Sequence, residues 1–278
     1  ELSELYSVTG GVPKYIELFS ESGDIYRAIQ KCVLNRSGYL YDEPHFLLQQ
    51  EVSEVGSYFS IIKAIAAGNH KLSSIASVLE VKSTNLTKYL KTLMDLDILE
   101  RRVPVTEENP EKSKRGLYKI KDNYLRFWFA FIYPNMSFIE SGHSGIVMDK
   151  IRKGLTTSHI GFVYEDICEE RMWELNVNNT WPFQFSKLGG YWDAKNEIDI
   201  AALDPEGKNL ILGECKYWKE PVGLNVLHAL EAKAGDVAWE RDRRKVWYVL
   251  FSISGFSDEL RNHAATRDDL LLIDDGER

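Results

Sequence analysis

Three ionisable residues in the C-terminal half of the chain are spaced for metal-dependent hydrolysis. Asp199 lies in one apolar run, and Glu214 and Lys216 lie in the next. Residues 204–207 (Asp-Pro-Glu-Gly) form a turn signal, which predicts that the two runs pair as a β-hairpin. Because side chains alternate along a strand, Glu214 and Lys216 point to one face, where Asp199 can converge with them. Two carboxylates and an ammonium in one place suit a divalent cation and a water nucleophile.

The same residues also have a simpler interpretation. Glu214 and Lys216 can form an ion pair on an exposed face of a sheet, where such a pair contributes little to stability. The apolar residues 210–212 and 200–202, however, indicate that both strands are buried. Charged residues at the ends of buried strands usually have a task, so we favour the functional interpretation.

The region around these residues alternates between the helical and the strand periodicity. We expect helices near 145–151, 159–175, 223–233 and 257–261, and strands at 183–188, 191–194, 197–203, 209–217, 245–252 and 270–273. Helices, a strand meander, a crossover helix and further strands predict an α/β domain with a mixed sheet over residues 135–278.

Residues 57–134 carry the pattern of a winged helix-turn-helix. Three apolar-periodic segments (58–67, 72–79 and 84–96) precede two short strands, 98–105 and 116–120. The region is basic, with 13 Lys and Arg against 8 Asp and Glu. The side chains expected to contact DNA lie on the third helix and the wing: Lys82, Ser83, Thr84, Asn85, Thr87, Lys88, Lys91, Arg101, Arg102, Lys112, Lys114 and Arg115. A winged helix can instead dock another protein; a steep salt dependence of binding would favour DNA.

Residues 1–56 read as a small helical subdomain. A break at residues 9–13 (Thr-Gly-Gly-Val-Pro) separates two helical segments, and Asp24 is a plausible N-cap for a helix over 24–35. The aromatic stretch at 124–129 predicts a helix packed between domains, because so many exposed rings would favour aggregation.

Composition is that of a soluble globular protein with two or three domains. The chain has 278 residues, 44% of them hydrophobic and 27% charged, and a net charge of −8. No apolar run is long enough to span a membrane, and no leader opens the sequence. The three cysteines lie far apart, which fits a reducing compartment, so we expect a cytoplasmic protein. The start at Glu1 suggests a fragment or a processed product.

The spacing Asp199…Glu214-x-Lys216, with a helix before the sheet and another after it, resembles the PD-(D/E)XK nuclease superfamily. The resemblance implies a restriction-endonuclease-like fold. It also implies four catalytic positions, carried over as Glu165, Asp199, Glu214 and Lys216. In this interpretation Glu165 holds a second metal ion or positions a metal-bound water.

The resemblance also assigns roles to the remaining groups. Asp199, Glu214 and the backbone carbonyl of Cys215 would hold Mg²⁺ or Mn²⁺. Lys216 would stay protonated and orient the attacking hydroxide or stabilise the transition state. Lys233, on the predicted crossover helix, is a further candidate for the site, although it could equally be a solvated surface residue.

A longer resemblance spans nearly the whole chain. Residues 9–15 resemble a lid motif, residues 116–122 and 125–129 a junction after the wing, and residues 162–165 the start of a nuclease-like domain. Together they resemble the C-terminal part of an archaeal-type DEXX-box ATPase of the AAA+/STAND class. This resemblance implies an ATPase lid in which Gly11, Pro13 and Lys14 touch nucleotide.

One departure from that family matters for activity. The chain has no Gly-x-x-x-x-Gly-Lys-[Ser/Thr] motif, so we expect no ATP hydrolysis from it. The lid residues would meet ATP only in the intact protein, with the missing N-terminal ATPase core present.

The sequence therefore predicts a multidomain α and α/β protein. We expect a helical lid subdomain at 1–56, a winged helix-turn-helix at 57–134 and a restriction-endonuclease-like mixed α/β domain at 135–278. The expected function is DNA binding coupled to Mg²⁺- or Mn²⁺-dependent phosphodiester hydrolysis, as the C-terminal region of an ATPase. The alternative is a non-catalytic DNA-binding, regulatory or scaffolding region with a nuclease-like fold. DNA and the ATPase core are the expected partners, without a membrane; the oligomeric state stays open.

Overall fold

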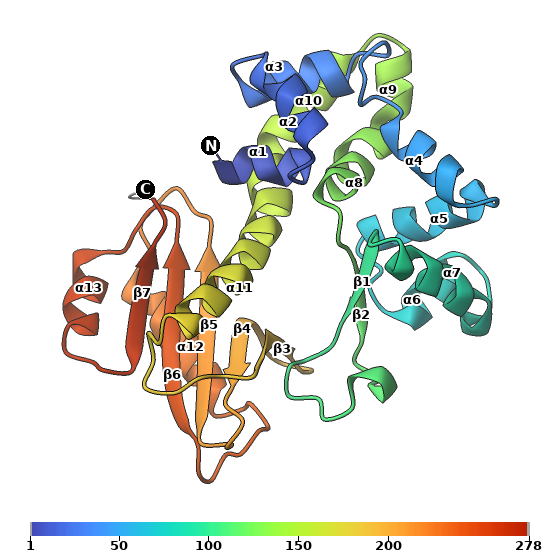
Figure 1. Cartoon of the computed structure of the whole chain (residues 1–278). Coiled ribbons are helices and arrows are strands. Elements are labelled where there is room, and N and C mark those ends of the chain that lie inside the picture. Colours follow the sequence, from blue (N-terminus) through green and yellow to red (C-terminus); the bar gives the residue numbers. More distant parts are fainter. Residues whose placement is uncertain (1, 277–278) are drawn as a thin grey trace. The chain divides into compact units, whose positions relative to one another are not determined.

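The chain forms two compact units in its computed structural model, which describes residues 2–276 (Figure 1). The first unit comprises Glu1–Arg102 and Arg115–Ile160, and the second comprises Val103–Lys114 and Gly161–Arg278. The three domain ranges expected from the sequence, with boundaries at 56 and 134, stay predictions.

The first unit is mainly helical. Its helices outside the central three-helix segment are α1 (Leu2–Thr9), α2 (Pro13–Ser20), α3 (Ile25–Ala28), α4 (Glu43–Glu51), α8 (Asn123–Phe127), α9 (Met136–Glu140) and α10 (Ser144–Leu155), with short π or 3₁₀ turns η1 (Ile29–Val33), η3 (Trp128–Ile132), η4 (Tyr133–Asn135) and η5 (Thr156–Ile160). The predicted N-cap is present, because the Asp24 side chain accepts a hydrogen bond from the Arg27 backbone N–H at 3.0 Å.

The central segment contains the three helices and the hairpin expected from the sequence. They are α5 (Val55–Ala66), α6 (Leu72–Val78), α7 (Ser83–Asp95), β1 (Leu99–Arg102) and β2 (Leu117–Ile120), with a 3₁₀ turn η2 (Pro110–Lys112) in the connection. The strands pair antiparallel. Helix α7 buries Leu86, Leu90 and Leu93, a helical spacing that leaves its opposite face to solvent.

The aromatic stretch of α8 and η3 is buried, as its composition predicted. Tyr124, Phe127 and Trp128 are each at most 1% exposed. Their polar atoms are satisfied: the Tyr124 hydroxyl donates to the Leu40 carbonyl, and the Trp128 indole N–H donates to the Tyr41 carbonyl at 2.9 Å.

The second unit is built on one mixed sheet. Its strands are β3 (Lys187–Trp192), β4 (Glu197–Leu203), β5 (Asn209–Lys216), β6 (Lys245–Ser252) and β7 (Leu270–Asp274), and its helices are α11 (Gly161–Val177), α12 (Leu224–Ala234) and α13 (Asp258–Ala264). In the described residues the strand order is β3-β4-β5-β6-β7. The first two pairings are antiparallel and the last two are parallel, with α12 as the crossover between β5 and β6.

Each face of the sheet has its own hydrophobic core. On the α12 face, Val226, Leu227 and Leu230 pack on Leu210 and Leu212. The opposite face carries α11, whose apolar side chains pack with a second set from the sheet (Figure 1): Tyr164, Cys168, Met172, Ile200, Ala202, Ile211, Cys215, Val249 and Phe251. A sheet covered on both faces explains why its central strands are almost wholly apolar.

The first strand of this sheet differs from the sequence prediction. Residues 183–186 are not in a strand, and β3 runs without a break through Gly189. Phe183 and Phe185 instead pack onto the α11-side core, so their aromatic character reflects burial rather than pairing. A register shift between β3 and β4 follows Gly189, where β4 uses one more residue than β3.

The segment Val103–Lys114, which the sequence assigned to the wing, belongs to the second unit. The Val105 backbone N–H donates to the Gly190 carbonyl at 3.0 Å, and the Val105 side chain packs against the α12-side core. This contact covers part of the free edge of β3. Among residues 2–276 we find no helix whose length and apolarity would let it cross a lipid bilayer.

Candidate functional site

The predicted Asp199 site forms where two strands of the sheet separate. The β4–β5 ladder runs up to the pair Ile200↔Gly213 and does not continue to Asp199. In place of the next ladder bond, the Cys215 backbone N–H donates to the Asp199 carboxylate (Oδ2) at 2.9 Å. The carboxylate therefore occupies the gap between the strands and lies against the backbone of the Glu214–Lys216 segment.

Glu214 and Lys216 share one face, as strand alternation predicted, and Asp199 meets them there. The Lys216 ammonium (Nζ) lies 3.3 Å from Asp199 Oδ2 and 2.5 Å from Glu214 Oε2. Three ionisable groups from two strands therefore converge on one spot.

Lys233 brings a second ammonium to the cluster from α12. Its Nζ donates to Glu214 Oε1 at 2.7 Å and to the Glu197 carbonyl at 2.8 Å. Its side chain is 28% exposed, so it is not the solvated surface lysine that the sequence left open. Both carboxylate oxygens of Glu214 are thus held by ammonium groups.

The cluster is buried enough to exclude the simple surface ion pair. The side chains of Glu214, Asp199 and Lys216 are 8%, 16% and 17% exposed. Charges with this little access to water need partners, and here two carboxylates face two ammonium groups. Removing four charged groups from water costs free energy that their mutual attraction only partly offsets. Such clusters are common at binding and catalytic sites, so this one is a candidate site.

The two carboxylates have opposite pKa shifts. Burial and the neighbouring charge of Glu214 raise the pKa of Asp199. Burial would also raise the pKa of Glu214, but the charges and hydrogen bonds of Lys216 and Lys233 outweigh it and lower that pKa. Burial opposes the charge of Lys216, yet Asp199 and Glu214 outweigh it and raise its pKa, so this ammonium stays protonated.

Glu165 lies on α11, which packs on β5 from the other side of the sheet. It is half-buried. Burial, the Cys168 thiol and the charge of Asp199 raise the pKa of the Cys215 thiol, and the charge of Glu165 adds a smaller contribution. Cys215 points to this α11 face and contacts Cys168, whereas Glu214 and Lys216 point to the α12 face. Glu165 therefore lies near Cys215 of β5, but on the opposite face of the sheet from Glu214 and Lys216.

The donor set fits a hard divalent cation. Within residues 2–276 no cluster of three or more His, Cys, Asp or Glu has the arrangement of a metal site. Mg²⁺, however, commonly binds to one or two carboxylates and keeps several waters. Asp199 and Glu214 supply two, and the Cys215 carbonyl points to the same strand gap as the Cys215 N–H, because both groups of a strand residue face one side.

The residues predicted to contact DNA are divided between the two units. Lys82, directly before α7, is exposed, as are five residues of the helix: Thr84, Asn85, Thr87, Lys88 and Lys91. Ser83 is half-buried. On β1, Arg102 pairs with Glu100, and the guanidinium of Arg101 lies against Gly116. Lys114 is exposed but belongs to the second unit, whereas Arg115 belongs to the first.

The predicted lid residues lie at the turn between α1 and α2. Gly11 has φ +78°, a conformation that favours glycine, and a Cβ there would meet the Tyr6 ring at 3.1 Å. Pro13 opens α2, where its missing N–H costs nothing. Lys14 forms an exposed pair with Glu17 at 2.9 Å.

A known family profile matches residues 128–233. The family, DUF234, is described as "Archaea bacterial proteins of unknown function". The matched range contains Glu165, Asp199, Glu214, Lys216 and Lys233.

An uncharacterized protein of Methanocaldococcus jannaschii is 38% identical over 220 residues, which cover 79% of this chain and 48% of the relative. The chain thus spans about half the length of that relative. Among solved structures, a repair endonuclease from Pyrococcus abyssi is 10% identical with a TM-score of 0.25, over 39% of this chain and 46% of that chain. A likeness this low supports no conclusion about this chain.

Two residues beside the site were not singled out from the sequence. Cys168, a buried residue of α11, contacts the Cys215 thiol, a pairing that no local spacing reveals. Trp218 follows Lys216 by two residues and is 48% exposed. Extending the face alternation of β5 by one step could have placed Trp218 on the side of Lys216.

Proposed function

We propose that the second unit is a metal-dependent nuclease that hydrolyses DNA phosphodiester bonds. The observation that carries this proposal is the convergence of Asp199, Glu214, Lys216 and Lys233 on one nearly buried spot, with the carboxylate of Asp199 set into the gap between β4 and β5. Paired carboxylates with a protonated lysine are the chemical requirement of such hydrolysis.

The residues of the chain have separate tasks in this proposal. Asp199, Glu214 and the Cys215 carbonyl hold Mg²⁺ or Mn²⁺, which when bound activates water and stabilises charge on the phosphate. Lys216 donates to a non-bridging oxygen of the scissile phosphate or orients the nucleophile. Lys233 keeps Glu214 ionised and in place through its bond to Oε1. Glu165, from the α11 side, positions a water or holds a second cation.

The balance of charges in the cluster predicts that metal and DNA bind together. Without ligands, the two ammonium groups neutralise the two carboxylates. A divalent cation adds positive charge that the phosphodiester can offset, so metal and DNA should bind cooperatively. Both ligands favour a movement of the Lys216 ammonium away from Asp199 and Glu214 and toward the phosphate.

The test is cleavage of plasmid and branched DNA with Mn²⁺ by the wild type and by Asp199→Ala. We expect nicking by the wild type and a loss of at least about 100-fold in rate in the variant, the scale of one removed electrostatic group at a reacting centre. The matched control is Glu206→Ala, an acidic residue in the exposed turn between β4 and β5, which should cleave like the wild type.

The proposal is wrong if the wild type fails to cleave under these conditions, or if Asp199→Ala and Glu206→Ala cleave equally. Mn²⁺ binding measured by calorimetry gives a readout that does not depend on turnover. It should weaken in Asp199→Ala and Glu214→Gln and stay unchanged in Glu206→Ala.

We further propose that α5–α7 with β1 and β2 form a winged helix that binds duplex DNA through the exposed face of α7. Support comes from the apolar stripe of Leu86, Leu90 and Leu93 on one side and the polar and basic residues on the other. In the intact protein an ATPase core would precede this region, and Gly11, Pro13 and Lys14 would contact its nucleotide. Nucleotide state would then regulate access of DNA to the nuclease.

A further inference from the structure

The molecule carries one exposed tryptophan directly beside the charge cluster. Trp218 is 48% exposed, and the Lys216 ammonium lies 5.8 Å from the centre of its ring. Between them in sequence, the Tyr217 ring turns to the other side and contacts Tyr164 on α11 at 5.5 Å. Lys216 and Trp218 therefore share the side on which Glu214 also lies.

The backbone that carries this ring is fastened to the end of β6. The Trp218 carbonyl accepts a hydrogen bond from the Ser254 hydroxyl, and the Lys216 carbonyl accepts one from the Ile253 N–H at 3.3 Å. A few residues later, the Val222 N–H donates to the Gly255 carbonyl at 2.9 Å. The segment from 216 to 222 is thus held at both ends, and the indole stands on a fixed support.

An exposed tryptophan on a rigid support exposes a large apolar surface to water, which costs free energy unless a ligand covers it. The Lys216 ammonium lies over one face of the ring, in a cation–π contact. If Lys216 binds a phosphate, the Trp218 ring, whose centre lies 5.8 Å from that ammonium, stands beside the bound nucleotide. Flat aromatic side chains beside a phosphate-binding cation are typical of stacking platforms for bases.

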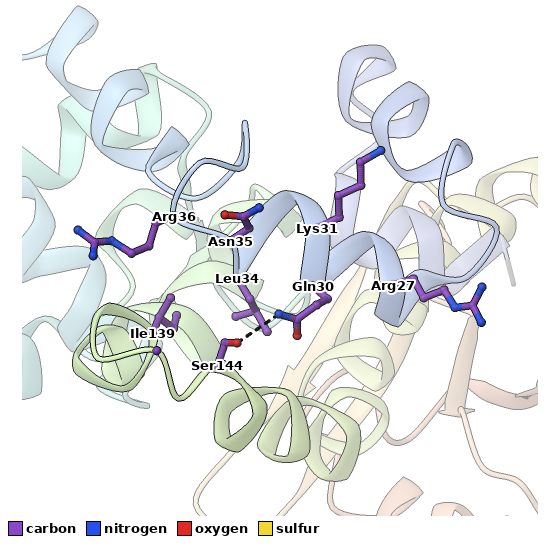
Figure 2. Close-up of a pocket in the computed structure, with 9 residues that line it drawn as sticks. Arg27, Gln30, Lys31, Leu34, Asn35, Arg36, Ile139 and Ser144 are labelled. Carbon is purple, nitrogen blue, oxygen red and sulfur yellow. Dashed lines mark hydrogen bonds between the residues drawn. The ribbon is translucent and has the colours of Figure 1, made fainter.

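The pocket that lies between α3, η1 and the α9–α10 turn is a weaker candidate. It has a volume of about 520 Å³ and is lined by three basic residues, Arg27, Lys31 and Arg36. Figure 2 shows these three side chains pointing away from one another rather than toward a common centre. The three basic side chains therefore do not form one anion-binding site, and we propose no ligand for this pocket.

We infer that Trp218 is a stacking subsite for an unpaired base next to the scissile phosphate. This inference rests on the proposed nuclease function and names its substrate class. In a duplex, neighbouring base pairs cover both faces of each base, so a ring at this position can stack only on a base that is single-stranded, terminal or flipped out. The preferred substrate is then a single strand, a flap or a branched junction rather than continuous duplex.

Two measurements test the subsite. In the first, a single-stranded oligonucleotide containing 2-aminopurine is titrated with protein in Ca²⁺, and stacking is read as quenching of the probe. In the second, single-turnover cleavage with Mn²⁺ compares a flap substrate with a continuous duplex of the same sequence. Both use the wild type, Trp218→Ala, Trp218→Phe and the matched control Trp173→Ala, since Trp173 on α11 is 44% exposed.

We expect Trp218→Ala to lose the quenching, to bind the single strand at least about fivefold more weakly and to lose the preference for the flap. Trp218→Phe should keep most of both signals, and Trp173→Ala should match the wild type. Cleavage of flap and duplex with equal efficiency by the wild type, or unchanged quenching in Trp218→Ala, overturns the subsite.

The outcomes separate this inference from the proposed function. If the wild type does not cleave but quenches the probe in a Trp218-dependent way, the hydrolytic proposal fails and the stacking subsite stands. If the wild type cleaves in an Asp199-dependent way and Trp218→Ala behaves like Trp173→Ala, the nuclease stands and the subsite fails. Absence of quenching by the wild type also overturns the subsite.

Discussion

At the scale of single residues, Asp199 and Glu214 have opposite relations to stability although both are acidic and nearly buried. The ionised form of Asp199 is disfavoured by burial and by Glu214, as its raised pKa records. The ionised form of Glu214 is favoured by two lysines, as its lowered pKa records. At neutral pH the ionised Asp199 therefore destabilises the fold, and the ionised Glu214 stabilises it. Residues that destabilise the fold are typical of functional sites.

This contrast predicts that substitutions at the two positions change stability in opposite directions. At pH 7 Asp199→Asn should raise the free energy of unfolding, because the amide oxygen can still accept from the Cys215 N–H without the buried charge. Glu214→Gln should lower it by roughly 1–3 kcal/mol, because Lys216 and Lys233 lose their common ionised partner. Urea-induced unfolding measures both.

The control for this pair of variants is Lys208→Ala. Lys208 and Glu206 are each 68% exposed, so loss of their ion pair should leave the free energy of unfolding nearly unchanged. A decrease in stability of the same size for Asp199→Asn and Glu214→Gln would contradict the charge assignment.

His159 is a buried residue whose effect appears at acid pH. Its Nε2–H donates to the Ser7 carbonyl at 2.6 Å, and its ring packs between Phe127 and Phe131. Burial, with a smaller contribution from the charge of Arg126, lowers the pKa of His159 to about 4. The unfolded chain, with an ordinary histidine, binds this proton at a higher pH than the folded chain does.

The lowered pKa predicts that stability is full above about pH 6.5 and falls as the pH decreases toward 4. Over this window the loss is about 3 kcal/mol, because each unit of pKa difference corresponds to about 1.4 kcal/mol. His159→Gln should be less stable than the wild type at pH 7, and the difference should shrink at pH 4.5. Urea unfolding at both values measures this, and parallel pH profiles would contradict it.

At the scale of elements, the position of β5 relative to its neighbours sets the site geometry. Gly213 directly precedes Glu214 and pairs with Ile200 of β4 and with Val249 of β6. A Cβ at this position would lie 2.7 Å from Val249 Cγ1, 3.0 Å from the Val249 carbonyl and 3.2 Å from Ile200 Cβ. Contacts with a strand backbone and two β-branched side chains cannot relax cheaply.

We therefore expect Gly213→Ala to displace β5 just before the site. The cost in stability should be about 1–3 kcal/mol, the usual range for overpacking a core. Cleavage should fall further than stability explains, because Glu214 shifts relative to Asp199. Gly235→Ala is the control, since a Cβ at Gly235 has no neighbour within 4 Å. Equal activities of the two variants, measured well below their unfolding temperatures, would contradict this prediction.

At the scale of the whole molecule, our proposals assign duplex-DNA affinity to the first unit and hydrolysis to the second. The proposed phosphate contacts lie on α7 in the first unit, and the charge cluster lies in the second. The chain is acidic overall, with a net charge of −8, so the proposed duplex binding requires a local basic face rather than general electrostatic attraction.

This division predicts distinct kinetic effects. The double variant Lys88→Gln/Lys91→Gln should raise KM for duplex DNA and reduce the salt slope of binding by about 2, with kcat unchanged. Asp199→Ala should lower kcat by at least about 100-fold and leave the duplex affinity measured without metal unchanged. Lys153→Gln, an exposed lysine of α10, is the control. A salt slope that stays unchanged in the α7 variant would favour docking of a protein by this region.

The sequence was sufficient for features that depend on local geometry. Strand alternation placed Glu214 and Lys216 on one face, helical spacing placed Leu86, Leu90 and Leu93 on the buried side of α7, and Asp24 was recognised as an N-cap. These features follow from the covalent chain, whose periods of 2 and 3.6 residues are the same in every protein.

Tertiary structure alone decided how distant groups meet. The separation of β4 from β5 lets Asp199 bond to the Cys215 N–H, and the packing of α12 on the sheet brings Lys233 to Glu214. The same long-range packing draws Phe183 into a core instead of a strand. Which side chains share a face is a property of the local chain, but which faces meet depends on how the whole sheet and its helices bury their apolar surface.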